Sequence, residues 1–291
     1  MFRGAITALV TPFKDGKVDE AALRELIEFQ IANGIDGLVP CGTTGESPTL
    51  SHDEHDRVIE ITIDAAKKRV PVIAGTGSNS TAEALRLTRH AFEAGADGAL
   101  IACPYYNKPT QEGLYLHFSQ IAKSVPFPIV PYNIPGRTGV NMSPDLIARL
   151  AKIDNIVGIK EASGSLKQMN DVLDLCGPDF DVLSGDDGFT LPLMAIGGKG
   201  VISVASNIVP ADMAAMVDAA EAGDFAAARR LHTKMSPLFD VLFIEVNPIP
   251  VKAALALMGR IACEYRLPLC PMAPANHEKL KKALASYGLI S

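Results

Sequence analysis

The sequence has no C-x-x-C pair, no long apolar run and no block of basic residues. Nothing approaches the ~18 consecutive apolar residues of a membrane-spanning helix. The N-terminal segment MFRGAITALVTPFKDG lacks the basic start, the longer apolar region and the cleavage site of a signal peptide. The net charge of −6 is modest, which disfavours binding to nucleic acid or to a membrane surface. We therefore expect a cytoplasmic protein.

The five cysteines are scattered and odd in number, which argues against a disulfide framework or a structural zinc site. Unpaired cysteines are easiest to maintain in a reducing cytosol. The composition, 48% hydrophobic and 21% charged, is that of a globular protein. The 291 residues suffice for one large barrel or for two ordinary domains.

Short apolar runs rich in β-branched residues alternate with amphipathic helical stretches. They show little alternation of polar and apolar residues, as expected of parallel strands buried on both faces. The expected strands are Ile6–Val10, Gly37–Val39, Pro71–Ala74, Gly98–Ala102, Pro128–Tyr132, Ile156–Lys160, Asp181–Leu183 and Gly200–Val204. The expected helix-start capping boxes are Ser51-x-x-Glu54, Ser80-x-x-Glu83 and Ser165-x-x-Gln168.

Eight β-then-α units predict an α/β fold, a closed (β/α)8 TIM barrel. A doubly wound open sheet is the alternative, but the first strand lacks the glycine fingerprint usual in that fold. Helices over Asp224–Leu242, Pro250–Met258 and Asn276–Tyr287 follow without a further strand. We therefore expect a barrel over residues 1–223 and a helical C-terminal extension over residues 224–291.

The active site of such a barrel lies at the C-terminal ends of the strands. There Lys160 ends an apolar strand, where desolvation would lower its pKa and free the amine to attack a carbonyl. Most other lysines fall on helices or at helix ends. The alternative interpretation is a structural ion pair of Lys160 with Glu161 or Asp186, and position alone does not separate the two.

Other strand-end residues offer further chemistry. The phenols of Tyr132 and Tyr106 lie at neighbouring strand ends and could shuttle protons. The alternative is that each is a half-buried aromatic residue with a hydrated hydroxyl. The Gly42–Gly45 loop could hold an anion with its N–H groups, or is only a turn. Arg137 is a planar donor fork suited to a carboxylate, or is a solvated surface arginine.

Two absences narrow the chemistry. The loops after the last two strands carry Asp186 and Asp187 and no basic residue, which disfavours a phosphorylated substrate. The six histidines fall mainly on helices, which leaves a metal-dependent aldolase poorly supported. His52 and His55 could pair on a metal, although a solvated helix start is the favoured interpretation. We expect no metal site.

Six motifs occur in order along the chain. They are GTTGES, PYYNKP, YNIPGRTG, GIKEASG, LSGDD and GVISV, with NPIPVK in the extension. In this order they resemble the dihydrodipicolinate synthase family of the pyruvate-dependent class I aldolase superfamily, over the whole chain. No catalytic position departs from the family pattern.

The resemblance implies a reaction and a role for each matched residue. Lys160 would form an imine with pyruvate, and Thr43 and Thr44 would bind the pyruvate carboxylate. Thr43, Tyr132 and Tyr106 would form a proton relay, with Tyr106 supplied by the other subunit of a tight dimer. The implied product is 4-hydroxy-tetrahydrodipicolinate, at the first committed step of lysine and diaminopimelate biosynthesis.

The second substrate, L-aspartate-4-semialdehyde, would bind through its carboxylate to Arg137. The main chain near Gly185 and Ile202 would complete the pocket. The family uses no organic cofactor or required metal, and its members are usually homotetramers built as dimers of dimers.

Some family members are inhibited by L-lysine at the tight dimer interface. Position 48, where some lysine-sensitive members carry alanine, is Pro48 here. The positions matching that site are Ser47, His52, His55, Asn79, Glu83 and Tyr105.

Two competing hypotheses remain. One is a related lysine-dependent aldolase, acting on N-acetylneuraminate or on a 2-keto-3-deoxy sugar acid. The Arg137 loop discriminates, because polyhydroxy substrates call for hydrogen-bonding side chains rather than a carboxylate clamp. The other is a catalytically silent barrel that senses lysine or a keto acid.

Overall fold

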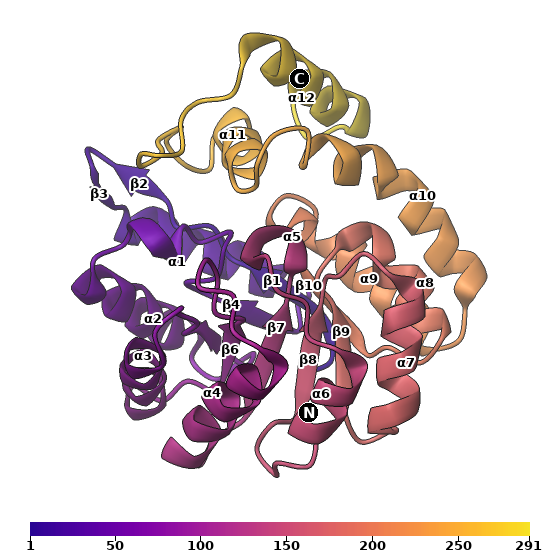
Figure 1. The fold of residues 1–291 in the computed structure, drawn as a ribbon. Helices are drawn as coiled ribbons and strands as arrows, with labels where there is room; N and C mark the ends of the chain where they lie inside the picture. The colour runs from indigo at the N-terminus through magenta and orange to yellow at the C-terminus, as the bar shows by residue number, and fades with distance from the viewer.

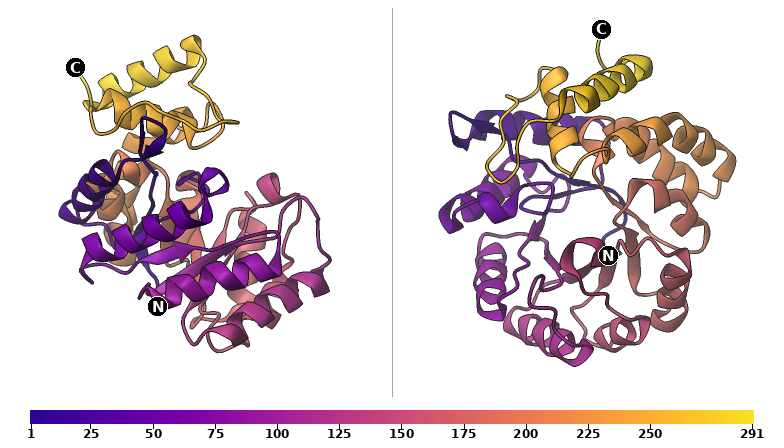
Figure 2. Two further views of the ribbon diagram at one scale, coloured as in Figure 1. Left: turned by 90° about the vertical axis from the view of Figure 1, so that its left-hand side faces the viewer. Right: turned by 45° about the horizontal axis from the view of Figure 1, so that its top comes forward.

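The computed structural model describes all 291 residues and is built around eight parallel strands. The sheet runs in the order β4-β1-β10-β9-β8-β7-β6-β5. Its two edges meet where the Leu38 N–H donates to Pro71 (3.0 Å) and the Gly75 N–H to Pro40 (2.9 Å). The predicted closed (β/α)8 barrel is confirmed (Figure 2). The strands are β1 (Gly4–Ala8), β4 (Gly37–Val39), β5 (Ile73–Gly75), β6 (Gly98–Ala102), β7 (Ile129–Asn133), β8 (Gly158–Glu161), β9 (Asp181–Ser184) and β10 (Gly200–Ser203).

Apolar side chains cover both faces of this sheet. A small cluster fills the barrel and includes Tyr132 and Ile202 of the expected site. A much larger cluster lies between the strands and the surrounding helices. Burial on both faces explains why the strands show no polar alternation in the sequence.

Helices alternate with the strands and form a ring around the barrel (Figures 1 and 2). The two shortest, α5 and α8, follow the C-terminal ends of β7 and β9. The helices are α1 (Glu20–Ala32), α2 (His52–Ala66), α3 (Thr81–Glu93), α4 (Gln111–Ser124), α5 (Pro135–Thr138), α6 (Pro144–Leu150), α7 (Leu166–Cys176), α8 (Thr190–Ala195) and α9 (Pro210–Glu221).

The three expected capping boxes have different outcomes. The box at the start of α2 is confirmed, because the Ser51 and Glu54 side chains each bond the other's N–H. At α7 only half of the capping box forms. Ser165 accepts from the Gln168 N–H, while the Gln168 side-chain amide donates to Asn141. The box at α3 is wrong. Its carboxylate, Glu83, bonds Ser78 and His52 instead.

A two-stranded hairpin after β1 was not predicted. It joins β2 (Phe13–Lys14) to β3 (Lys17–Val18) through a turn with positive φ at Asp15 and Gly16. The residues KDGK carry this turn signal, but two-residue strands are too short to show a periodic pattern.

The C-terminal extension contains α10 (Phe225–Val241), α11 (Ile249–Leu257) and α12 (Pro274–Tyr287), close to the predicted ranges. It lies across one end of the barrel, beside the β2–β3 hairpin (Figure 1). We propose the turn at Gly223 as the boundary between the barrel, residues 1–223, and the extension, residues 224–291. None of the helices has the length and apolar character needed to cross a membrane.

Candidate active site

Lys160 is a buried amine at the C-terminal end of β8. Its side chain is only 6% exposed, and its Nζ lies 4.2 Å from the ring centroid of Tyr132, its register partner on β7. Burial lowers the pKa of Lys160 to about 7, and this change is opposed by the Asp187 carboxylate and reinforced by Arg137. Near neutral pH a large fraction of the amine is therefore unprotonated and nucleophilic.

The alternative of a structural ion pair is wrong for this lysine. Glu161 accepts hydrogen bonds from Asn133 (3.0 Å) and the Ser163 N–H (2.6 Å), on the other side of the strand. Asp186 accepts from the Gly188 N–H (2.8 Å). Both carboxylates have other partners, and the strand alternation turns Glu161 away from the barrel interior.

Gly185, at the end of β9, leaves room for the lysine. A Cβ at this position would lie 3.0 Å from Cε and 3.3 Å from Cγ of Lys160, and 2.7 Å from the Cβ of Ala162. Any side chain there would push the amine out of place. Ile202 on β10 is fully buried in the same barrel-filling cluster as Tyr132. The structure thus places Gly185 against Lys160 and Ile202 inside the barrel.

Thr43 and Thr44 lie in the loop after β4. Both flanks of this loop have left-handed backbone at non-glycine residues, Cys41 (φ 55°) and Glu46 (φ 53°). Gly45 leaves little room for a side chain, because a Cβ there would lie 3.1 Å from the Cys41 nitrogen. The loop is closed by its own backbone hydrogen bonds, from the Gly45 N–H to Gly42 (3.1 Å) and from the Glu46 N–H to Thr43 (3.1 Å).

Asn247 connects this loop to Arg137. Its Nδ2 donates to Thr44 Oγ1 (3.0 Å), and its carbonyl accepts from Nη2 of Arg137 (2.9 Å). Arg137 is exposed, as a surface arginine would be, but it lines the same pocket as Tyr132 and is held there by this contact. The remaining N–H groups of its guanidinium stay available to a ligand in the pocket.

Tyr132 and Tyr106 have opposite environments. Tyr132 is buried, which raises the pKa of its phenol. Tyr106 is 89% exposed, has positive φ (69°) and does not line the pocket that Tyr132 lines. Within one chain the structure brings Lys160 and Tyr132 together but not Tyr106.

A cavity of about 410 Å³ lies beside Lys160, which is not itself among the lining residues but whose ring neighbour Tyr132 is. Thr43, Tyr132 and Arg137 line one part of it. The residues of the expected lysine site that line it are Ser47, Pro48, His52, His55, Glu83 and Tyr105. Asn79 does not line the cavity, but its carbonyl accepts from the Asn107 side chain beside the two tyrosines (2.9 Å).

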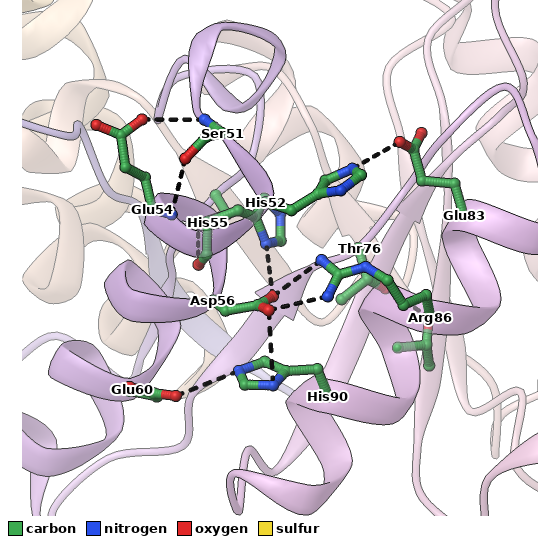
Figure 3. A network of polar contacts seen from close by, with 12 residues as sticks. Ser51, His52, Glu54, His55, Asp56, Glu60, Thr76, Glu83, Arg86 and His90 are labelled. Atoms are coloured by element: carbon green, nitrogen blue, oxygen red, sulfur yellow. Dashed lines mark hydrogen bonds and ion pairs between the residues drawn. The ribbon is translucent and has the colours of Figure 1, made fainter.

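Residues of the expected lysine site belong to a polar network (Figure 3). His52 on α2 contacts Glu83 on α3 (2.8 Å), and Ser78 donates to the same carboxylate. These two contacts, Ser78 first, lower the pKa of Glu83. Burial lowers the pKa of His55 to about 4, although the Asp56 carboxylate lies 3.9 Å away.

A metal site at the histidine pair is not supported. His52 is exposed and bonds Glu83, while His55 is buried, so the two side chains lie in different environments. No three His, Cys, Asp or Glu side chains gather closely enough to hold a metal ion. The interpretation of a solvated helix start holds for His52 and is wrong for His55.

Three residues that contact the site or its loops, Asn247, Asp187 and Lys252, were not assigned to the site in the sequence-based prediction. Asp187 is buried with one oxygen bonded to the Val204 and Ala205 N–H groups, and burial raises its pKa to about 6. Lys252 forms a buried ion pair with Glu46. The NPIPVK motif contains two of these residues, and its position in the extension hid their contact with a loop about 200 residues earlier.

Comparison with family models identifies the group to which the chain is related. The model of the dihydrodipicolinate synthetase family matches residues 1–287. The chain belongs to this family. Similar relatives named 4-hydroxy-tetrahydrodipicolinate synthase occur in Syntrophus aciditrophicus (71% identity) and Syntrophobacter fumaroxidans (65% identity), each matched over 100% of both chains. This family membership favours the main hypothesis over the related sugar-acid aldolases.

Solved structures that resemble this chain agree with the family assignment. The dihydrodipicolinate synthase from Aquifex aeolicus has a TM-score of 0.98 at 52% identity, over 99% of each chain. The chloride-inhibited enzyme from Acinetobacter baumannii, complexed with pyruvate, has a TM-score of 0.98 at 48% identity, over 100% of each chain. The enzyme from Cyanidioschyzon merolae with lysine bound has a TM-score of 0.97 at 42% identity, over 99% of each chain.

Proposed function

We propose that the chain condenses pyruvate with L-aspartate-4-semialdehyde through a Schiff base on Lys160. The product is 4-hydroxy-tetrahydrodipicolinate, at the first committed step of lysine and diaminopimelate biosynthesis. The observation that carries this proposal is the buried Lys160 amine, which has no carboxylate partner and a lowered pKa at the mouth of the barrel. Family membership and the pyruvate complex of a relative support the choice of substrate.

The reaction begins when the neutral amine of Lys160 adds to the ketone carbon of pyruvate. Loss of water leaves an iminium ion, and removal of a methyl proton gives the enamine. The enamine carbon attacks the aldehyde, whose oxygen takes up a proton. The amine of the semialdehyde then attacks the iminium carbon, which closes the ring and releases Lys160. Each step moves a proton, and no organic cofactor or metal is required.

The protein groups divide these tasks. Thr43 and Thr44 bind the pyruvate carboxylate in the loop after β4. Tyr132, beside Lys160 on the next strand, passes protons to and from the carbinolamine with Thr43 and Tyr106. The free donors of Arg137 bind the semialdehyde carboxylate, as a planar guanidinium does well. The main chain at Gly185 and Ile202 completes the pocket.

The exposed Tyr106 supports an assembly in which each subunit completes its neighbour's site. An aromatic ring that is 89% exposed on a backbone with positive φ is costly in an isolated chain. A tight dimer that inserts Tyr106 into the partner's proton relay would offset that cost. We extend the proposal to a homotetramer, a dimer of such dimers, in the cytoplasm. The five free cysteines agree with a reducing compartment.

L-lysine is the proposed inhibitor, at the part of the cavity lined by His52, Glu83 and Tyr105. The Glu83 carboxylate suits an amine of the ligand, and the lysine-bound relative supports the assignment. Tyr105 adjoins Tyr106 in the chain, so a ligand on the first can shift the second. The remaining residues of the proposed site are Ser47, Pro48, His55 and Asn79.

Borohydride reduction tests the covalent step directly. Reduction in the presence of pyruvate should add a pyruvate-derived mass to the peptide that carries Lys160 and abolish activity. Lys167, exposed on α7, serves as the internal control and should stay unmodified. A label on another lysine, or no label, would refute the mechanism.

A further inference from the structure

A second buried lysine lies outside the reacting groups. Lys252 on α11 has a fully buried side chain, and its ammonium pairs with the carboxylate of Glu46, which is also fully buried. Its Nζ lies 4.2 Å from the ring centroid of Phe13. Burial lowers the pKa of Lys252, and the Glu46 carboxylate opposes that change. Because desolvation offsets much of the attraction in such a pair, net stability does not explain its presence.

The backbone conformation of Glu46 indicates a role for its ion pair with Lys252. Glu46 ends the Gly42–Gly45 loop with a φ of 53°, in the left-handed region that disfavours residues with a side chain. Strained conformations of this kind persist only where surrounding contacts hold them. The Glu46 carboxylate is held by Lys252 and lies 3.5 Å from the Arg266 N–H, while its carbonyl accepts from the Thr49 N–H (2.9 Å).

The C-terminal extension contacts the same loop at two further points. Asn247 donates to Thr44 Oγ1 (3.0 Å), and Nη1 of Arg266 donates to the Thr49 carbonyl (2.9 Å). Thr44 is itself one of these contact points, and Thr43 directly precedes it. The conformation of the loop is thus set by the extension as well as by the barrel strand that precedes it.

We propose that Lys252 is a positioning residue for pyruvate, which fixes the Thr43–Thr44 backbone by holding Glu46 in its left-handed conformation. This inference rests on the proposed role of Thr43 and Thr44 in binding the pyruvate carboxylate. Lys252 touches no substrate. Its loss should therefore weaken pyruvate binding and leave the semialdehyde subsite at Arg137 largely intact.

The test is the pyruvate concentration that gives half-maximal borohydride trapping, together with the KM of each substrate. Lys252→Met should raise the pyruvate values about tenfold and change the semialdehyde KM less than threefold. The control is Lys234→Met on α10 of the same extension, which breaks a surface pair with Asp212 of α9 and should leave the values for both substrates unchanged. If Lys252→Met lowers thermal stability while pyruvate trapping stays normal, the pair is only structural and the inference is wrong.

A double variant removes the risk that an unpaired buried charge unfolds the protein. Glu46→Gln with Lys252→Met leaves no charge at the site, so it should fold. Without the ion pair, nothing replaces the contact that holds position 46 in its left-handed conformation, so the pyruvate values should stay raised. A return to the starting values would overturn the inference.

Thr44→Val separates this inference from the function on which it rests. If Thr44→Val leaves pyruvate trapping unchanged, the assignment of the loop to pyruvate fails, and the inference fails with it. If Thr44→Val weakens trapping while the Lys252 variants do not, the proposed function stands and only the inference is overturned.

Discussion

Burial of the Lys160 amine should make the fold less stable, and the cost should depend on pH. The pKa of this lysine falls from its ordinary 10.5 to about 7, and a pKa change of one corresponds to about 1.4 kcal/mol. The native state therefore binds the proton more weakly than the unfolded chain by roughly 5 kcal/mol. Lys160→Met removes this penalty and should stabilise the protein.

The sign follows from the two pKa values. Below pH 7 the buried amine is protonated and the whole penalty applies. Between about pH 7 and 10.5 the native amine is neutral while the unfolded chain still binds the proton. Protonation stabilises the unfolded chain less and less as pH rises, so the penalty falls toward zero near pH 10.5. Stability of the unsubstituted protein therefore rises with pH across this window. Lys160→Met should thus gain up to roughly 5 kcal/mol at pH 6 and less than about 1 kcal/mol at pH 10.

Urea unfolding followed by circular dichroism, at pH 6, 8 and 10 and one protein concentration, measures this difference. A fixed concentration matters because an oligomer's stability depends on it. Lys167→Met, at an exposed lysine paired with Asp171, is the control and should change stability by less than about 1 kcal/mol. A gain from Lys160→Met that stays constant across this pH range would refute the desolvation argument.

Two further predictions concern substrate and inhibitor. Arg137→Ala should raise the semialdehyde KM by about one to two orders of magnitude, since a charge-assisted contact contributes ~1.5–3 kcal/mol. Pyruvate trapping at Lys160 should survive this change, and equal damage to both would show that the role is misassigned. Glu83→Ala should relieve inhibition by millimolar L-lysine, a coupling of about 1–3 kcal/mol, with uninhibited turnover kept within about twofold. If saturating lysine neither binds by calorimetry nor slows the reaction, the regulatory site is inactive and Pro48 is the first suspect.

The sequence predicted the elements that depend on local pattern. All eight barrel strands and the three helices of the extension lie within about two residues of their expected positions. Strand-end position also singled out Lys160, Tyr132 and Arg137, which the structure brings to the same end of the barrel, because the carboxyl ends of parallel strands meet there. These predictions succeed since neighbouring residues determine them.

The errors arose where a distant residue competes for a side chain. Glu83 has the spacing of a capping box, but His52 on another helix and Ser78 in the preceding loop bind its carboxylate. Asn247 reaches Thr44 across 203 positions of the chain. No pattern within a helix or strand carries that information.

The two buried lysines show what separates a nucleophile from a structural charge. Lys252 sits on a helix, where the sequence suggests a solvated side chain, yet it is fully buried. Lys160 ends a strand, where burial was expected. Position alone therefore does not assign the roles. The decisive difference is the partner: Glu46 pairs with Lys252 and opposes the lowering of its pKa, whereas Glu161 and Asp186 are bonded elsewhere and leave Lys160 unpaired. An unpaired amine in a buried site loses its proton readily, and on the proposed mechanism this loss makes Lys160 nucleophilic.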